Sequence, residues 1–174
     1  METAIRRDTA PAYVAELLDI TTSDQTVIRA RHMYDGERLV QLADSYVPVD
    51  VAEAAGVENP DPGLGGIISR MRDAGFEQTE AIEEITQYPA TSVEAEAFGV
   101  EVGSQLLQIT HTGYTKTGRA VEVTVPARAP AGRRGAYLRL QVAKAAEDSN
   151  PSPSPAGPPL TRESRCARAL RWRS

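Results

Sequence analysis

Two arginines, Arg29 and Arg31, lie two residues apart in the segment from Val27 to Pro48. Asp35-Gly36, in the middle of this segment, predicts a tight turn, because glycine tolerates the positive φ that short hairpin loops need. The segment therefore predicts two antiparallel strands, with both guanidinium groups on one face of the sheet. Paired arginine forks are suited to binding a carboxylate or a phosphate. The alternative is that both are ordinary solvent-exposed charges, and this segment by itself favours that alternative.

A glycine-rich stretch, Gly63 to Gly66, is the second candidate for anion binding. It precedes a predicted helix that ends near Gly75, and the free N–H groups at the start of a helix attract anions. The stretch has neither the spacing of a dinucleotide-binding fingerprint nor the lysine of a phosphate-binding P-loop. It can also be a loop that simply allows the chain to turn.

The sequence offers little for catalysis or metal binding. His32 and His111 are the only histidines and Cys166 is the only cysteine, so no multi-cysteine zinc site or disulfide framework is expected. No Ser/His/Asp or Cys/His arrangement is evident. Glu83 and Glu84 are neighbours on a predicted strand and point to opposite faces, so they cannot act as a catalytic pair. We therefore expect no cofactor, no metal and no enzymatic activity.

Composition predicts a soluble globular protein. The 174 residues are 41% hydrophobic and 25% charged, enough for one domain with a real core. The single cysteine fits a reducing cytoplasm. No apolar run is long enough to span a bilayer, and the N-terminus lacks the apolar core of a signal peptide. A cytoplasmic protein without membrane association is expected.

The C-terminal segment differs from the rest of the chain. Residues 144–174 carry six basic and three acidic residues, a net charge of +3, which leaves −8 for residues 1–143 out of the total of −5. An acidic body of this kind is not a nucleic-acid surface. Ser149–Pro159 is rich in proline and serine and cannot form a helix or a central strand. We therefore expect a folded domain over 1–143 and a basic tail over 144–174 that is disordered, the alternative being an arm that binds a partner.

The folded part predicts helices and strands in alternation. Hydrophobic periodicity and turn residues predict helices at 10–18, 51–56, 64–75 and 92–98. They predict strands at 27–34, 38–47, 76–88, 105–115, 119–125 and 136–142. The glutamates of 80–84 also allow a helix there.

Several short motifs carry more information in their order than any of them does alone. They are Arg29-x-Arg31, Val40-Gln41-Leu42-Ala43-x-Ser45-Tyr46-x-Pro48, Gly63-x-Gly65-Gly66-Ile67 followed by Arg70, Ala90-Thr91-x2-Glu94-Ala95, and Gly118-Arg119-x-Val121-Glu122-Val123. Over residues 1–143 this series resembles the UTRA domain, the ligand-sensing part of GntR-type transcription regulators of the HutC subfamily, in its actinobacterial form.

The resemblance implies an α+β, chorismate-lyase-like fold, with a central antiparallel sheet flanked by helices. It also implies a homodimer that binds a small anionic metabolite between the sheet and the helix beginning at Gly65. The implied ligand-binding residues are Arg29, Arg31, Ser45, Tyr46, Gly65, Gly66, Ile67, Glu84, Glu122 and Tyr137. Sugar-phosphate sensors of this type often carry hydroxyl side chains where this chain has Gly66-Ile67-Ile68, which weakens the assignment of a sugar phosphate as the ligand.

Family members carry an N-terminal winged helix-turn-helix, and nothing before Arg29 has the length or basic charge of one. We therefore expect DNA binding only through a head that this sequence does not contain, with the ligand shifting the spacing of two such heads. Two other functions remain open. One is an enzyme resembling chorismate lyase, and the other is an interaction module without a ligand.

Overall fold

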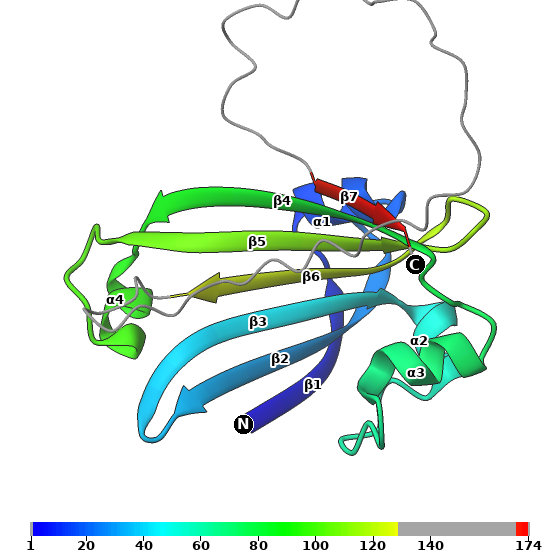
Figure 1. Ribbon diagram of the computed structural model, residues 1–174, viewed down its shortest axis with the longest axis horizontal. Helices are drawn as coiled ribbons and strands as arrows, with labels where there is room; N and C mark the ends of the chain where they lie inside the picture. The colour runs from blue at the N-terminus through cyan, green and yellow to red at the C-terminus, as the bar shows by residue number, and fades with distance from the viewer. Residues whose placement is uncertain (1, 129–169, 174) are drawn as a thin grey trace, which may run out of the picture.

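A single seven-stranded sheet forms the centre of the protein (Figure 1). The computed structural model describes residues 2–128 and, as backbone only, residues 170–173. The strands lie in the order β1-β2-β3-β6-β5-β4-β7, and every neighbouring pair is antiparallel. Their bounds are β1 Glu2–Thr9, β2 Gln25–Asp35, β3 Arg38–Pro48, β4 Glu80–Pro89, β5 Gln105–Tyr114, β6 Ala120–Arg128 and β7 Leu170–Arg173.

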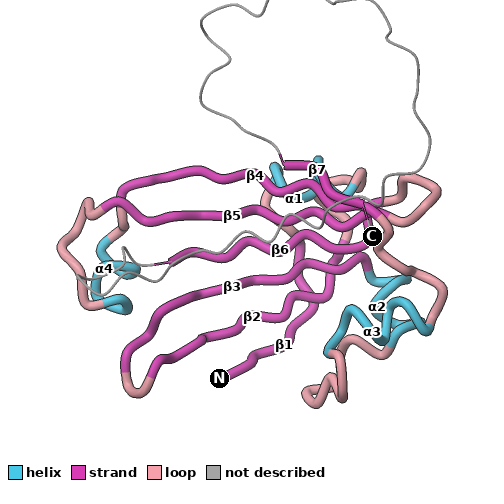
Figure 2. The backbone as a smooth tube through the Cα atoms, in the orientation of Figure 1, coloured by secondary structure: helices cyan, strands magenta, loops and turns pink. Residues whose placement is uncertain are grey.

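Among the described residues, four short helices lie around this sheet. They are α1 Ala12–Leu18, α2 Val49–Ala55, α3 Gly66–Asp73 and α4 Ser92–Phe98. Helices α2 and α3 lie together at one end of the sheet, α4 lies at the other end, and α1 lies behind the strands in this view (Figures 1 and 2). In the described part of the chain, no helix is long and apolar enough to cross a membrane.

The predicted hairpin and helices are confirmed, with shifts of a few residues at their ends. The stretch at 80–84, for which a helix was also possible, is part of strand β4. Strand β1 is absent from the prediction. It is an edge strand in which Glu2–Thr9 pair with residues 25–32 of β2, and its mostly exposed, charged residues show no apolar alternation.

The C-terminal tail contributes one strand. Leu170–Arg173 pairs with Glu80–Glu83 at the edge of the sheet, so at these four residues the expectation of disorder is wrong. The rest of 144–174 and the strand predicted at 136–142 lie outside the described residues, and so does Tyr137. The boundary at residue 143 remains a prediction.

The two faces of the sheet differ in what covers them. We call the face that carries Arg31, Ser45 and Thr124 the arginine face, and the opposite one, which carries Asp44 and Tyr46, the tyrosine face. On the arginine face a core is formed with α2 and α3 by Val27, Val47, Val51, Ala52, Ala55, Val57, Ile67, Met71 and Val121. On the tyrosine face, α1 packs in a cluster with Ala10, Val14, Leu18, Ile28, Tyr46, Ala120 and Val123, and α4 packs in another with Leu39, Ala90, Ala95, Phe98, Leu106 and Ala127.

Candidate functional site

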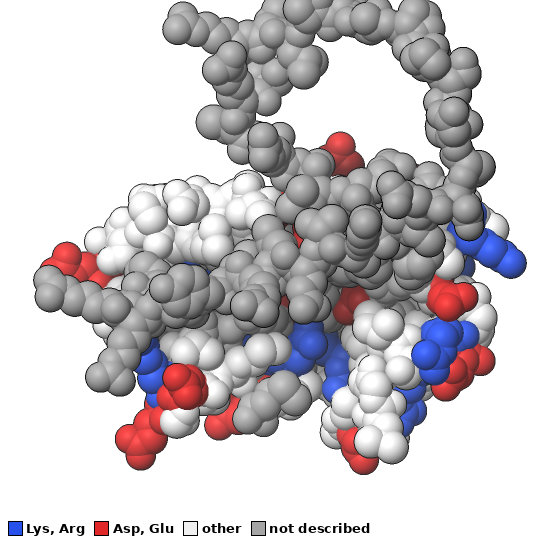
Figure 3. Space-filling model, viewed as in Figure 1, with Lys and Arg blue, Asp and Glu red and all other residues white. Residues whose placement is uncertain are grey.

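A hollow of about 480 Å³ lies on the arginine face, beside the core formed with α2 and α3. Its volume is in the range typical of small-molecule sites. It is lined by Arg31, Gly65, Gly66, Ile67, Ile68, Glu83, Ile109, His111, Glu122, Thr124, Pro126 and Arg128. On this side of the molecule, basic side chains lie between the strands and the α2–α3 pair, with acidic side chains around them (Figure 3). Five of the ten predicted ligand-binding residues therefore border one hollow.

The start of α3 forms one wall, as the glycine-rich stretch predicted. Gly65 and Gly66 have φ values of 83° and 69°, a left-handed conformation that favours glycine. A Cβ atom on Gly65 would lie only 2.1 Å from Oγ of Ser69. The two glycines thus bring the bare backbone next to the hollow, with Ile67 anchored in the core below.

A chain of hydrogen bonds crosses the floor of the hollow. Arg31 Nη2 donates to Ser45 Oγ (2.6 Å), Ser45 Oγ lies 2.7 Å from Thr124 Oγ1, and Thr124 Oγ1 donates to Glu122 Oε1 (2.9 Å). A hydroxyl has only one proton to donate. Because Thr124 donates its proton to Glu122, Ser45 must be the donor to Thr124. The chain therefore runs in one direction from the cation of Arg31 to the carboxylate of Glu122. Ser45 is fully buried and positions Arg31 from below.

Glu122 is held on its other side by Gln78, a residue that sequence reasoning missed. Gln78 Nε2 donates to Glu122 Oε2 (2.9 Å), so each carboxylate oxygen accepts a hydrogen bond. Gly113 faces Glu122 across the strands, and a Cβ atom on Gly113 would lie 2.2 Å from Oε1 of Gln78. The glycine leaves the space in which the Gln78 amide lies.

Two arginines at the hollow keep unused donors. Within residues 2–128, Nε of Arg31 and Nε of Arg128 are buried and have no hydrogen-bond partner. An unsatisfied buried donor costs about 1–3 kcal/mol, which an incoming acceptor would recover. The acidic groups are already partnered, since Glu83 Oε1 lies 3.4 Å from Nδ1 of His111 and Glu122 accepts two hydrogen bonds. The hollow therefore offers hydrogen-bond donors to a ligand that carries acceptor atoms.

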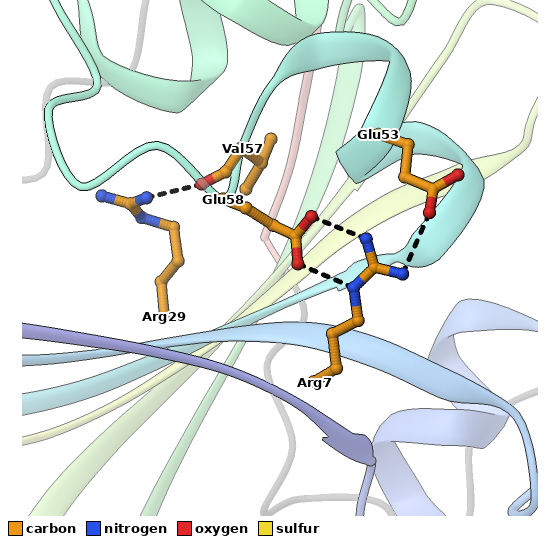
Figure 4. Close-up of polar contacts among 5 residues, drawn as sticks. All are labelled: Arg7, Arg29, Glu53, Val57 and Glu58. Atoms are coloured by element: carbon orange, nitrogen blue, oxygen red, sulfur yellow. Dashed lines mark hydrogen bonds and ion pairs between the residues drawn. The ribbon is translucent and has the colours of Figure 1, made fainter.

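Arg29 does not border the hollow. It is buried, and its guanidinium donates to three backbone carbonyls that follow α2. Nη1 donates to Val57 O (2.5 Å), as Figure 4 shows, and to Asn59 O (2.8 Å), and Nη2 donates to Pro60 O (3.4 Å). Burial, followed by the charges of Arg31 and Arg70, lowers the pKa of Arg29. The expected pair of ligand-binding arginines is thus divided, because the guanidinium of Arg29 donates to the loop before α3.

Other arginines hold the same loop. Arg70 of α3 donates from Nε to Pro62 O (2.7 Å) and from Nη2 to Asp61 O (2.9 Å). Arg7 of β1 forms a bidentate pair with Glu58 (2.7 and 2.6 Å) and an ion pair with Glu53 (2.9 Å), as Figure 4 shows. The loop that carries Gly65 to the hollow is therefore fixed by basic side chains from three elements.

Two further predicted residues lie elsewhere. Tyr46 is buried on the tyrosine face, where it packs with α1, and Glu84 is exposed, whereas its neighbour Glu83 lines the hollow. Side chains alternate along a strand, so Ser45 and Tyr46 could not both face one site. The same alternation provides the signal for two missed residues: once Glu122 faces the hollow, so do Thr124 and Arg128. No comparable signal in the sequence pointed to His111 or Gln78. Neither lies on the strand that carries Glu122, so alternation along that strand does not reach them.

Comparisons with known proteins agree with this geometry. Residues 3–126 match the family model of the UTRA domain. The chain belongs to the UTRA family. It is 27% identical over 124 residues to the uncharacterized HTH-type transcriptional regulator SCO4628 of Streptomyces coelicolor, covering 70% of this chain and 46% of that protein. The chain thus spans about half the length of this curated relative.

Solved structures of transcription regulators share the fold. A regulator from Streptomyces coelicolor superimposes with a TM-score of 0.62 at 26% identity, over 74% of this chain and 85% of that one. The ligand-binding domain of a regulator from Bordetella bronchiseptica gives 0.61 at 23%, over 74% and 82%. The predicted α+β, chorismate-lyase-like architecture is confirmed, and this UTRA domain is a ligand-sensing regulatory domain.

Proposed function

We propose that this UTRA domain senses a small metabolite with at least one anionic group, bound in the hollow on the arginine face. The observation that carries the proposal is a pair of buried Nε donors at one hollow, on Arg31 and Arg128, that have no partner among the described residues. Hydrogen bonds from a guanidinium to an anionic oxygen are shorter and stronger than neutral ones. The excess of cations around the α3 loop, from Arg29, Arg31 and Arg70, favours the same sign of ligand charge.

Glu122 supplies the second recognition element. It lines the hollow and is fixed by Thr124 and Gln78. A carboxylate held in this way retains lone pairs for a hydroxyl or an ammonium group of the ligand. The ligand would then bind with its anionic end at Arg31 and Arg128 and a donor group at Glu122, with the backbone of Gly65 and Gly66 beside it.

The test is a calorimetric and melting-temperature screen of carboxylated and phosphorylated metabolites against the wild type and the variants Arg31→Ala, Arg128→Ala and Glu122→Gln. A specific ligand at one hundred times its Kd should stabilise the fold by about 2.7 kcal/mol. Each arginine variant should lose roughly 1.5–3 kcal/mol of binding. The matched control is Arg72→Ala, a surface arginine paired with its neighbour Asp73, which should bind as the wild type does. Equal binding by all variants would show that the ligand does not bind in this hollow.

We propose further that the domain acts as a homodimer within a cytoplasmic regulator of the HutC subfamily, with DNA bound by a winged helix-turn-helix head outside these 174 residues. Ligand binding would shift the equilibrium between two arrangements of the dimer, by no more than the difference in ligand affinity between them. Sedimentation should show a dimer, and a monomer at high micromolar concentration would contradict this coupling.

We propose that the domain is not an enzyme, although chorismate lyase has a related fold. The hollow contains a carboxylate and arginines, but Glu122 already accepts hydrogen bonds from two donors, Gln78 and Thr124. Incubation with chorismate should give no product. If product formed with the wild type but not with the Glu122→Gln variant, the domain would be an enzyme rather than a sensor.

A further inference from the structure

A second hollow, of about 470 Å³, lies on the tyrosine face, behind the site already described. Its floor is the sheet, where Ala30, Leu42, Val125 and Ala127 present small or apolar side chains. Its two ends are formed by α1 and by α4 with the end of β4. The hollow is therefore a distinct space, separated from the arginine-face hollow by the thickness of the sheet.

Three tyrosines from three elements stand around this hollow: Tyr13 from α1, Tyr46 from β3 and Tyr88 from β4. Tyr46 is buried, and Tyr13 is 46% exposed, so its ring is available to a ligand. Only six tyrosines occur in the chain, and half of them border this one space. Tyrosine rings attract cations through their negative faces.

The ring of Tyr88 is fixed in place. Its hydroxyl donates to Glu94 Oε1 (2.5 Å), while Glu94 Oε2 accepts from the backbone N and Oγ1 of Thr91 (3.0 and 2.7 Å) in the capping box of α4. The carboxylate of Glu94 is thus used by the helix start. The wall that Tyr88 forms is rigid before any ligand arrives, which lowers the entropic cost of binding.

Asp44 of β3 is the other carboxylate that borders the hollow. It lines the same space as the phenols of Tyr13 and Tyr46. In keeping with this, burial, followed by the charge of Asp44, raises the pKa of both Tyr13 and Tyr46. Arg31 also borders this hollow, but its guanidinium donates to Ser45 on the other face. His32 borders it as well, with Nδ1 3.7 Å from Glu2.

We propose that the tyrosine-face hollow is a second small-molecule site, which takes an organic cation such as a methylated ammonium between Tyr13, Tyr46 and Tyr88, with Asp44 as its counter-charge. A methylated ammonium matches this surface because its apolar methyl groups suit the floor and the rings, while its charge suits the rings and the carboxylate. The site has the opposite charge preference to the arginine-face hollow and does not depend on the function proposed for that hollow.

The test is a calorimetric titration of the full chain with choline chloride, with sodium chloride balancing ionic strength, and with 3,3-dimethylbutan-1-ol as an uncharged analogue of the same shape. Choline should bind at one site per chain, and the alcohol should bind at least tenfold more weakly. Equal affinity for both, or no heat from choline up to 50 mM, would overturn the proposal.

Variants locate the site. Asp44→Asn and Tyr13→Ala should each weaken choline binding at least fivefold, whereas Tyr13→Phe, which keeps the ring, should stay within twofold of the wild type. Arg72→Ala, at a surface arginine that borders neither hollow, should bind choline unchanged. Tyr13 is half exposed, so its variants should fold even if Asp44→Asn does not. Unchanged binding by Tyr13→Ala, or loss of binding by Arg72→Ala, would contradict the placement.

Discussion

The two faces of the sheet are built from alternate residues of the same strands, yet they are held together by different interactions. On the arginine face, buried or half-buried cations fix a loop: Arg29 and Arg70 donate to the backbone carbonyls of residues 57–62. On the tyrosine face, α1 and α4 are held by apolar packing and by one capping box. A charged residue on a strand can therefore stabilise the fold as readily as it binds a ligand.

The largest expected effect is that of Arg29→Ala, which removes the donors from three loop carbonyls. Hydrogen bonds to a charged group are worth roughly 1.5–3 kcal/mol each, so we expect a loss of about 3 kcal/mol in the free energy of unfolding, measured by urea denaturation. Arg31→Ala, which leaves the loop intact, should lose less than about 1 kcal/mol. If the Arg29→Ala variant had normal stability but no longer bound ligand, Arg29 would be a ligand-binding residue. Its role would then not differ from that of Arg31.

The tyrosine face should respond to alkaline pH. Burial, followed by the charge of Asp44, raises the pKa of Tyr46 to about 12 from the ordinary value of 10. Because the folded state favours the protonated phenol, this contribution to stability is complete below pH 10 and is lost as the pH rises from 10 to about 12.

Denaturation midpoints of the wild type should therefore fall over this pH range, and those of Tyr46→Phe should fall less steeply. Arg31→Ala is the control from the opposite face and should follow the wild type. Parallel curves for wild type and Tyr46→Phe would show that the phenol of Tyr46 does not titrate in this way.

A smaller effect is expected at α4. Thr91→Ala removes the side chain that accepts from the backbone N of Glu94 and donates to its carboxylate. Loss of such a cap costs about 1 kcal/mol, seen as a lower melting temperature. Thr91→Ser keeps the hydroxyl and should restore most of the loss. Failure of serine to do so would mean that packing of the threonine methyl group, rather than the cap, stabilises this end of the tyrosine face.

Much of the fold could be predicted from the sequence, because its signals are local. The Asp35-Gly36 turn, the Thr91–Glu94 capping box and the alternation of apolar residues in 105–115 each act within a few residues. Strand β1 escaped prediction because an exposed edge strand needs no apolar face, and β7 because its pairing with β4 joins residues far apart in the chain.

The candidate site was predicted in part, for a physical reason. Strict alternation along the strands puts Arg31 and Glu122 on the face that also meets the start of α3, and it excludes Tyr46 and Glu84 from that hollow. Alternation could not separate Arg29 from Arg31, because both face the same side of β2. What separates them is the path of residues 57–62, whose carbonyls capture Arg29, and that path is set by tertiary contacts.

The most direct test of the central claim follows the arginine Nε–Hε resonances by nuclear magnetic resonance during titration with inorganic phosphate or with a ligand found in the screen. We expect the Arg31 and Arg128 signals to move with the bound fraction, because their Nε groups are buried at the hollow and have no hydrogen-bond partner in the described part of the chain. The Arg29 signal should stay in place. Movement of the Arg29 signal with no change at Arg31 and Arg128 would contradict the assignment of the hollow as the effector site.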